Sequence, residues 1–177
     1  LAISVLVAGG AFVACGGSSN EPEVFGGLKT QPVLGVRSKS VITVEAKQYR
    51  DLNGNSKLDL YEDWRRTTDV RVDDLVVRMT LEEKAGLMLI ETLNGGCGGA
   101  ASPTAFTFVN TQKMHRFIFR NVVNAVGTCA ADAGIRAGSQ LTPQQAAQYT
   151  NAIQAMTEAT RLGIPALFKS NARNHFE

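Results

Sequence analysis

Hydrophobic residues recur at helical spacing near the carboxyl end of the chain. Thr142, Pro143 and Gln145 give a start signal, because helices commonly begin with a Thr cap, a first-turn proline and a Gln that completes a capping box. Gly163 gives a stop signal, since glycine readily adopts the left-handed conformation that follows a helix. The pattern predicts a helix over 143–162, with an apolar face formed by Tyr149, Ala152, Ile153, Met156 and Ala159.

Two short apolar runs flank this helix. Residues 114–121 include Phe117, Ile118 and Phe119 in succession, and residues 164–168 read IPALF. Such runs are typical of strands that are buried on both faces. Strand, helix and strand together predict a right-handed parallel βαβ unit. We expect His115 to be a surface residue at a strand edge and not a metal ligand.

Weaker patterns divide the chain before residue 114. Residues 71–79 predict a short helix, and Thr80 with Glu83 forms a capping box that begins another. The Gly-rich tract 94–103 predicts a loop. Residues 41–49, VITVEAKQY, alternate as in a strand, so we expect the ordered domain to cover 41–177.

The first 40 residues have a different character. Residues 1–14 are apolar and uncharged but too short to span a bilayer, and they lead into Cys15. Segment 1–15 therefore resembles a bacterial lipoprotein signal with Cys15 as the lipidated residue; an ordinary secretory signal with a chance cysteine is the alternative. Residues 16–40 predict a flexible tether. Because the chain opens on Leu1 and stops at Glu177, we expect a longer natural protein.

Either signal predicts export, where thiols oxidise. Cys97 and Cys129 are then candidates for a disulfide, and two free buried thiols remain the alternative. The chain has 18 basic and 16 acidic residues among 177, and its basic residues do not cluster. This distribution argues against a nucleic-acid partner.

Residues 51–62, DLNGNSKLDLYE, carry oxygen-bearing side chains at the spacing of a calcium loop. Ser56 stands where such loops turn sharply and favour glycine, so it is expected in the left-handed region. With two neutral amides in the set, we expect weak binding, on the order of 10⁻⁴ to 10⁻³ M, as in extracellular modules. An Asn/Gly turn followed by an acidic helix start is the alternative. The candidate ligands are Asp51, Asn53, Asn55, Lys57 through its carbonyl, Asp59 and Glu62.

Three stretches together resemble the amino-terminal barrel domain of glycoside hydrolase family 3, the β-glucosidase group. They are YRDLNGNSKLDLYEDWR, RVDDLVVRMTLEEKAGLML and EATRLGIPALFKSNARNH. The resemblance implies an α/β fold that is an incomplete (β/α)₈ TIM-type barrel. A complete barrel takes about 250 residues, so this chain would supply only about two or three βα units.

The resemblance also implies a retaining glycosidase that acts on terminal β-linked glucose or a related sugar without a cofactor. Its two catalytic carboxylates would lie beyond Glu177. Asn171 occupies the place where many members have a sugar-gripping aspartate. Arg173, Asn174 and His175 lie in the same loop and are candidates to line the sugar pocket, with capping of the strand end as the alternative. The partners implied are a β-glucoside and, through Cys15, a membrane. A non-catalytic, calcium-dependent binding module of a surface lipoprotein is the alternative.

Overall fold

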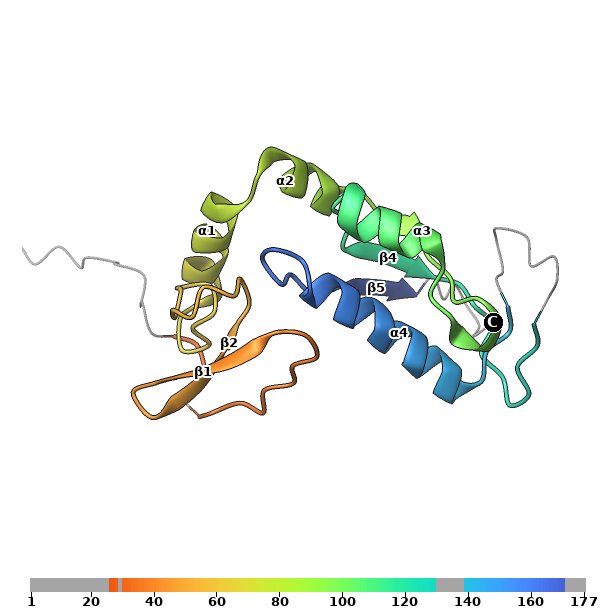
Figure 1. Ribbon diagram of the computed structural model, residues 1–177, viewed down its shortest axis with the longest axis horizontal. Helices are drawn as coiled ribbons and strands as arrows, with labels where there is room; N and C mark the ends of the chain where they lie inside the picture. The colour runs from red at the N-terminus through yellow and green to blue at the C-terminus, as the bar shows by residue number, and fades with distance from the viewer. Residues whose placement is uncertain (1–25, 29, 130–138, 171–177) are drawn as a thin grey trace, which may run out of the picture.

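The chain folds into a mixed α/β structure. The computed structural model describes residues 26–28, 30–129 and 139–170, and Figure 1 shows the arrangement of their elements. In chain order the elements are β1 (Ser40–Val44), β2 (Lys47–Asp51), α1 (Thr68–Arg78), α2 (Leu81–Met88), β3 (Glu91–Thr92), the 3₁₀ turn η1 (Cys97–Gly99), α3 (Pro103–Phe106), the π-helical turn η2 (Thr107–Thr111), β4 (Arg116–Phe119), α4 (Pro143–Glu158) and β5 (Leu167–Ser170).

A parallel sheet with the strand order β3-β4-β5 forms the centre of the carboxyl-terminal part. Phe117 of β4 pairs with Glu91 of β3 and with Phe168 of β5. Because α4 connects β4 to β5, the predicted parallel βαβ arrangement is confirmed. β5 begins at Leu167, three residues later than predicted, since Pro165 has no N–H to donate to a ladder.

The hydrophobic core lies on the face of the sheet that α3, η2 and α4 cover. Leu167, in contrast, is 61% exposed. The prediction that β5 is buried on both faces is therefore wrong for the described residues. Alternation along the strand explains the difference, because successive side chains point to opposite faces. The buried cluster consists of Leu93, Ala105, Val109, Met114, Phe117, Tyr149, Ile153 and Ala166.

The helix starts agree with their sequence signals. Both predicted capping boxes form: Thr80 with Glu83 begins α2, and Thr142 with Gln145 begins α4. Each box satisfies backbone N–H groups that have no partner inside the helix.

The end of α4 differs from the prediction. The helix stops at Glu158, and turns continue to Gly163, which has φ +60°. The hydroxyl of Thr160 donates to the carbonyl of Thr157 at 2.7 Å, in keeping with a tightened last turn. A side chain at Gly163 would lie 2.9 Å from the carbonyl oxygen of Leu52, so this close approach also requires glycine. Tyr149 and Ile153 are buried as predicted, whereas Ala152 and Ala159 are exposed.

The amino-terminal part contains a hairpin where the alternation predicted one strand. β1 and β2 pair in antiparallel register, with Val44 opposite Lys47. The intervening Glu45 and Ala46 have φ of +50° and +60°. Two left-handed residues in succession are the geometry of a two-residue hairpin turn, which reverses the chain within the alternating stretch.

Part of the segment expected as a tether is attached to this domain. The side chain of Glu158, at the end of α4, accepts hydrogen bonds from the backbone N–H groups of Arg37, Ser38 and Lys39 at 2.8, 2.9 and 3.1 Å. Gly27 also donates its N–H to the carbonyl of Arg65 at 2.9 Å. These contacts fix the described residues before β1 against the folded body. Within the described ranges, no helix is long and apolar enough to cross a membrane.

Replacing Glu158 by glutamine is expected to lower the free energy of unfolding by about 1 to 2 kcal/mol at neutral pH, because an amide oxygen accepts the three N–H groups less strongly than a carboxylate. Burial alone would raise the pKa of Glu158, but these N–H donors outweigh it and lower the pKa from 4.5. The carboxylate's contribution is therefore present above pH 4.5 and is lost as the pH falls through the lowered pKa.

Urea unfolding of parent and variant at about pH 7 and about pH 3 checks this prediction. Asp73→Asn, which makes the same chemical change on the exposed side of α1, is the control. A difference between parent and Glu158→Gln that stays constant with pH would contradict it.

Candidate functional site at the carboxyl edge of the sheet

The loops that leave β3 and β4 meet at the carboxyl edge of the parallel sheet. The side-chain Oδ1 of Asn94, two residues after β3, accepts a hydrogen bond from the backbone N–H of Arg120, the first residue after β4, at 2.9 Å. In parallel α/β folds this edge is where ligands bind. The contact fixes two neighbouring loops of the candidate site relative to each other.

Asn121 holds the same loops together from below the surface. Its side chain is buried, with Oδ1 accepting from the N–H of Gly95 at 2.8 Å. Its Nδ2 donates to the carbonyl of Gly95 at 2.9 Å and to that of Ser139 at 2.6 Å. One amide therefore satisfies three backbone groups from two chain segments.

A disulfide joins these loops covalently. Cys97, in the loop after β3, is bonded to Cys129, in the segment after β4, with a Cα–Cα distance of 4.7 Å. Of the two alternatives that the sequence left open, the structure has the disulfide. Gly99 beside it has φ +81°, and a side chain there would lie 2.6 Å from the carbonyl oxygen of Gln145, so the loop packs directly on the backbone of α4.

Aromatic side chains pack against one another beneath this edge of the sheet. Tyr149 of α4 is fully buried and stacks on Phe119, the last residue of β4, with ring centroids 5.9 Å apart. Phe168 of β5 lies against the same ring at 6.4 Å. Burial raises the pKa of Tyr149, so its hydroxyl stays protonated and takes no part in acid–base chemistry near neutral pH.

The residues predicted to contact sugar follow β5 at this edge. Ser170 ends β5 and pairs with Phe119, so the described chain enters the predicted loop beside Arg120. Asn171, Arg173, Asn174 and His175 lie outside the described residues, as does Cys15. Their assignment to sugar and to lipid therefore stays a prediction.

His115 corrects a prediction at the opposite edge. It was expected on the surface, but it is 6% exposed. It directly precedes β4, and its Nδ1 lies 2.7 Å from the carbonyl oxygen of Ile164, which precedes β5. A pairing between residues 49 positions apart is not visible in the local pattern.

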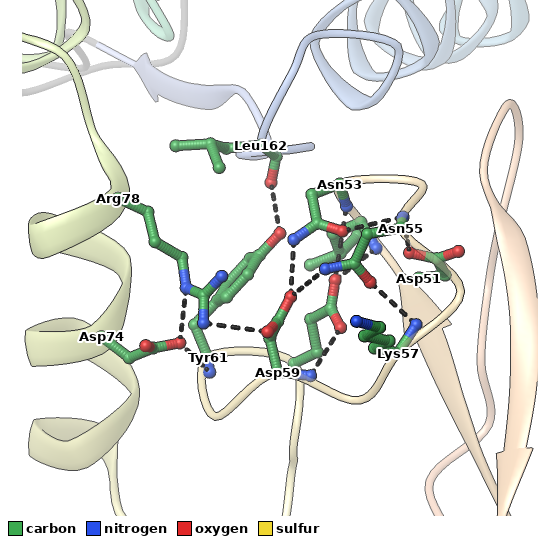
Figure 2. A network of polar contacts seen from close by, with 11 residues as sticks. Asp51, Asn53, Asn55, Lys57, Asp59, Tyr61, Asp74, Arg78 and Leu162 are labelled. Atoms are coloured by element: carbon green, nitrogen blue, oxygen red, sulfur yellow. Dashed lines mark hydrogen bonds and ion pairs between the residues drawn. The ribbon is translucent and has the colours of Figure 1, made fainter.

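The predicted calcium loop is a network of polar contacts between β2 and α1 (Figure 2). Asp51 is buried and accepts hydrogen bonds from the backbone N–H groups of Asn55 and Ser56, each at 3.0 Å. Ser56 has φ +60°, which confirms the expected left-handed turn. A strand and not a helix precedes the loop, which agrees with the expectation that no helix-loop-helix hand forms.

Asp59 is the centre of this network, as Figure 2 shows. Its Oδ2 accepts from Nδ2 of Asn53 at 2.6 Å and from Nδ2 of Asn55 at 2.8 Å. Its Oδ1 pairs with the guanidinium of Arg78 at 2.9 Å, and Arg78 also pairs with Asp74 at 2.9 Å. In this arrangement the two amides present nitrogen to the carboxylate, and Arg78 supplies the positive charge that pairs with Asp59.

Glu62 closes the loop from the other side. Its carboxylate accepts the backbone N–H groups of Leu52 at 2.7 Å and Asp59 at 3.1 Å. Burial raises the pKa of Glu62 although these hydrogen bonds oppose the shift. Lys57 donates its backbone N–H to Asn55 Oδ1 at 2.8 Å. Among the residues that the structure describes, no three His, Cys, Asp or Glu side chains gather closely enough to hold a metal ion.

Asn94, Asn121 and Glu158 are site and framework residues that sequence reasoning missed. The position of the two asparagines becomes informative only with the observed strand ends, because each then stands two residues after a strand in a parallel sheet. Polar residues in that position commonly lie at the ligand edge. For Glu158 the helical pattern offered no signal, since its partners precede it by about 120 residues.

Comparison with known proteins connects the chain to β-glucosidases. No family model matches it. The chain is 37% identical over 151 residues to the "Periplasmic beta-glucosidase/beta-xylosidase" of Dickeya chrysanthemi, covering 83% of this chain and 21% of that protein. It is 30% identical over 129 residues to the "Probable beta-glucosidase C" of Aspergillus oryzae, covering 69% of this chain and 17% of that protein. It is also 30% identical over 122 residues to the "Beta-glucosidase C" of Emericella nidulans, covering 67% of this chain and 17% of that protein. The chain thus spans about a fifth of the length of the curated relatives it matches.

Proposed function

We propose that the chain is the amino-terminal part of an exported glycoside hydrolase of family 3 that acts on β-linked glucose or a related sugar. The observation that carries this proposal is the similarity to proteins named β-glucosidase over most of the chain, bacterial and fungal relatives alike. The parallel βαβ arrangement supports it, because such units build a (β/α)₈ barrel. Residues 41–177 would form the first part of that barrel.

The reaction that we propose is hydrolysis with retention. It needs one carboxylate to attack the anomeric carbon and a second, about 5 to 5.5 Å away, to protonate the leaving oxygen. Both are expected in the protein beyond residue 177. The chain described here would contribute the wall of the sugar pocket, with Asn171 and Arg173 following β5.

Hydrolysis of aryl β-glucosides and β-xylosides by the full-length protein tests this function. Asn171→Ala is expected to lower kcat/KM about 5- to 150-fold, because it removes hydrogen bonds worth about 1 to 3 kcal/mol to a sugar hydroxyl. Lys169→Ala, two residues earlier at an exposed position of β5, is the control for an unspecific effect on the loop. A full-length protein that binds β-glucosides only with calcium and never cleaves them would support the binding-module alternative instead.

We also propose that the loop 51–62 binds calcium for stability and not for catalysis. Binding would turn the amide oxygens of Asn53 and Asn55 inward and would release Asp59 from Arg78. The dissociation constant is expected on the order of 10⁻⁴ to 10⁻³ M, since the ion must compete with this internal ion pair. Calcium would also compete with the proton that the raised pKa of Glu62 favours. The affinity for calcium should therefore increase with pH.

Calcium at about ten times its dissociation constant is expected to raise the free energy of unfolding by about 1.4 kcal/mol. Thermal unfolding in excess calcium and in chelator measures the difference, and Glu62→Gln is expected to abolish it. Glutamine keeps an acceptor for the N–H groups of Leu52 and Asp59 but cannot bind the ion with two carboxylate oxygens. Equal stabilisation of parent and variant would count against the site.

Export and lipid anchoring through Cys15 complete the proposal. The bacterial relative is named a periplasmic enzyme. A lipid chain on Cys15 would hold the protein to a membrane, which the short apolar run does not. Cys15→Ala is expected to move the protein from the membrane fraction to the soluble fraction of cells, and sedimentation of the variant with membranes would refute the anchor.

A further inference from the structure

A cavity of about 220 Å³ lies at the amino edge of the parallel sheet, opposite the candidate sugar edge. His115 and Ile164, which precede β4 and β5, line one side of it, and the arrowheads of these strands in Figure 1 point away from α2 and from this edge. The other lining residues include Glu83 and Leu87 of α2, Lys113 and Arg161. The cavity is smaller than the roughly 300–1,000 Å³ of pockets for drug-sized ligands, so it suits a ligand no larger than one sugar ring.

His115, which lines this cavity, keeps one hydrogen-bond acceptor. Its Nδ1 lies 2.7 Å from the carbonyl oxygen of Ile164, and because a carbonyl can only accept, Nδ1 carries the proton. Nε2 then has a free lone pair when the ring is neutral, and no described residue donates a hydrogen bond to it. Burial lowers the pKa of His115 although the bond to Ile164 opposes the shift, so the neutral form prevails near pH 7.

Lys113 supplies donors to the same space. Its ammonium donates to the carbonyl of Asn110 at 2.6 Å and keeps further N–H groups for a ligand. Arg161, in contrast, is paired with Glu83, which offsets both charges. Leu87, Leu162 and Ile164 give the cavity apolar walls.

This combination selects a hydroxyl-rich ligand over an anion or a metal. An anion would place lone pairs against Nε2 of His115 and lie near Glu83, and the described residues offer no cluster of metal ligands here. A hydroxyl can donate to Nε2 and accept from Lys113 at the same time. The carbon-bound hydrogens of a sugar ring would meet the apolar walls.

We propose that this cavity is a second sugar site, which binds a free monosaccharide at the amino edge of the sheet and away from the site of hydrolysis. A monosaccharide is also the product that the proposed reaction would release, so occupation of the cavity would report product concentration. The binding itself does not depend on the protein being a glycosidase.

Titration with D-glucose, followed by the imidazole ¹⁵N resonances, tests the second site. In the full-length protein, the resonances that disappear in His115→Gln identify the signal of His115. Glucose is expected to shift Nε2 of His115 saturably, with half-saturation at about 1 to 10 mM. Nδ1 should move less, because its carbonyl partner is internal.

Lys113→Asn is expected to weaken this binding at least about fivefold, through the loss of a donor to the sugar. Asparagine tolerates the φ of +56° at this position, so the backbone is preserved. Lys84→Asn on exposed α2 is the matched control and should bind like the parent. Leu87→Trp, which fills the cavity, should abolish the shift.

Three results would each overturn the proposal. The first is the absence of a saturable His115 shift up to about 0.2 M glucose. The second is unchanged affinity in both Lys113→Asn and Leu87→Trp. The third is displacement of glucose by sulfate at equal or lower concentration, which would identify an anion site. Because the readout is His115 and not turnover, a failure here leaves the proposed hydrolysis untouched.

Discussion

Replacing Cys97 and Cys129 by serine together is expected to lower the free energy of unfolding by about 3 to 4 kcal/mol. The disulfide closes a loop with a sequence separation of 32 residues, and the loss follows from the greater freedom of the unfolded chain without it. For a domain whose total stability is about 5 to 15 kcal/mol, the loss is large. The loops after β3 and β4 should also lose their fixed spacing.

Urea unfolding with and without reductant measures this effect. Both cysteines lie in exposed positions, so a reductant should reach the bond in the folded parent. Reduction of the parent should reproduce the stability of the double serine variant, and reductant should not change that variant further. Equal stability of the oxidised and reduced parent would show that the bond contributes nothing.

Replacing Asn121 by alanine is expected to cost about 3 kcal/mol, the second large effect. Its amide makes three hydrogen bonds, each worth about 1 kcal/mol, and truncation leaves the N–H and carbonyl of Gly95 without them. Asn121→Asp should cost at least as much at neutral pH, because a carboxylate cannot donate to the carbonyls of Gly95 and Ser139. Protonation at low pH should restore part of the loss.

Hydrogen exchange at the Gly95 amide is the local readout for both variants. Arg120→Ala, at the exposed position directly before Asn121, is the control and should cost less than about 1 kcal/mol. If Gly95 stays protected in Asn121→Ala, the amide does not hold the two loops together.

Sequence reasoning succeeded where the determining contacts are close in the chain. The capping boxes at Thr80 and Thr142 depend on residues three positions apart, and the βαβ pattern depends on periodicity within single elements. It failed where a partner lies far away. The burial of His115 depends on Ile164, and the turn at Glu45 and Ala46 interrupts a stretch whose alternation alone cannot distinguish one strand from two.

In the candidate sites, too, local features could be predicted from the sequence and long-range contacts could not. The polar spacing of loop 51–62 was visible, and so was the left-handed Ser56, because both are local. The role of Arg78 was not, since its contact with Asp59 joins the loop to a separate helix. Asn121 likewise reads as an ordinary loop residue until the sheet places it beside Gly95.

The attachment of residues 37–39 to Glu158 has a consequence for how the protein is made. These segments are about 120 residues apart, and at ordinary elongation rates of about 5 to 20 residues per second the ribosome adds Glu158 several seconds or more after Arg37. The hairpin can form early from neighbouring residues, but residues 37–39 before it have no carboxylate to bind until α4 emerges. Closing so long a loop costs more entropy than pairing β4 with β5 around α4. During synthesis, residues 37–39 are therefore fixed later than the hairpin that follows them, and a chaperone or protease would meet them before Glu158 binds them.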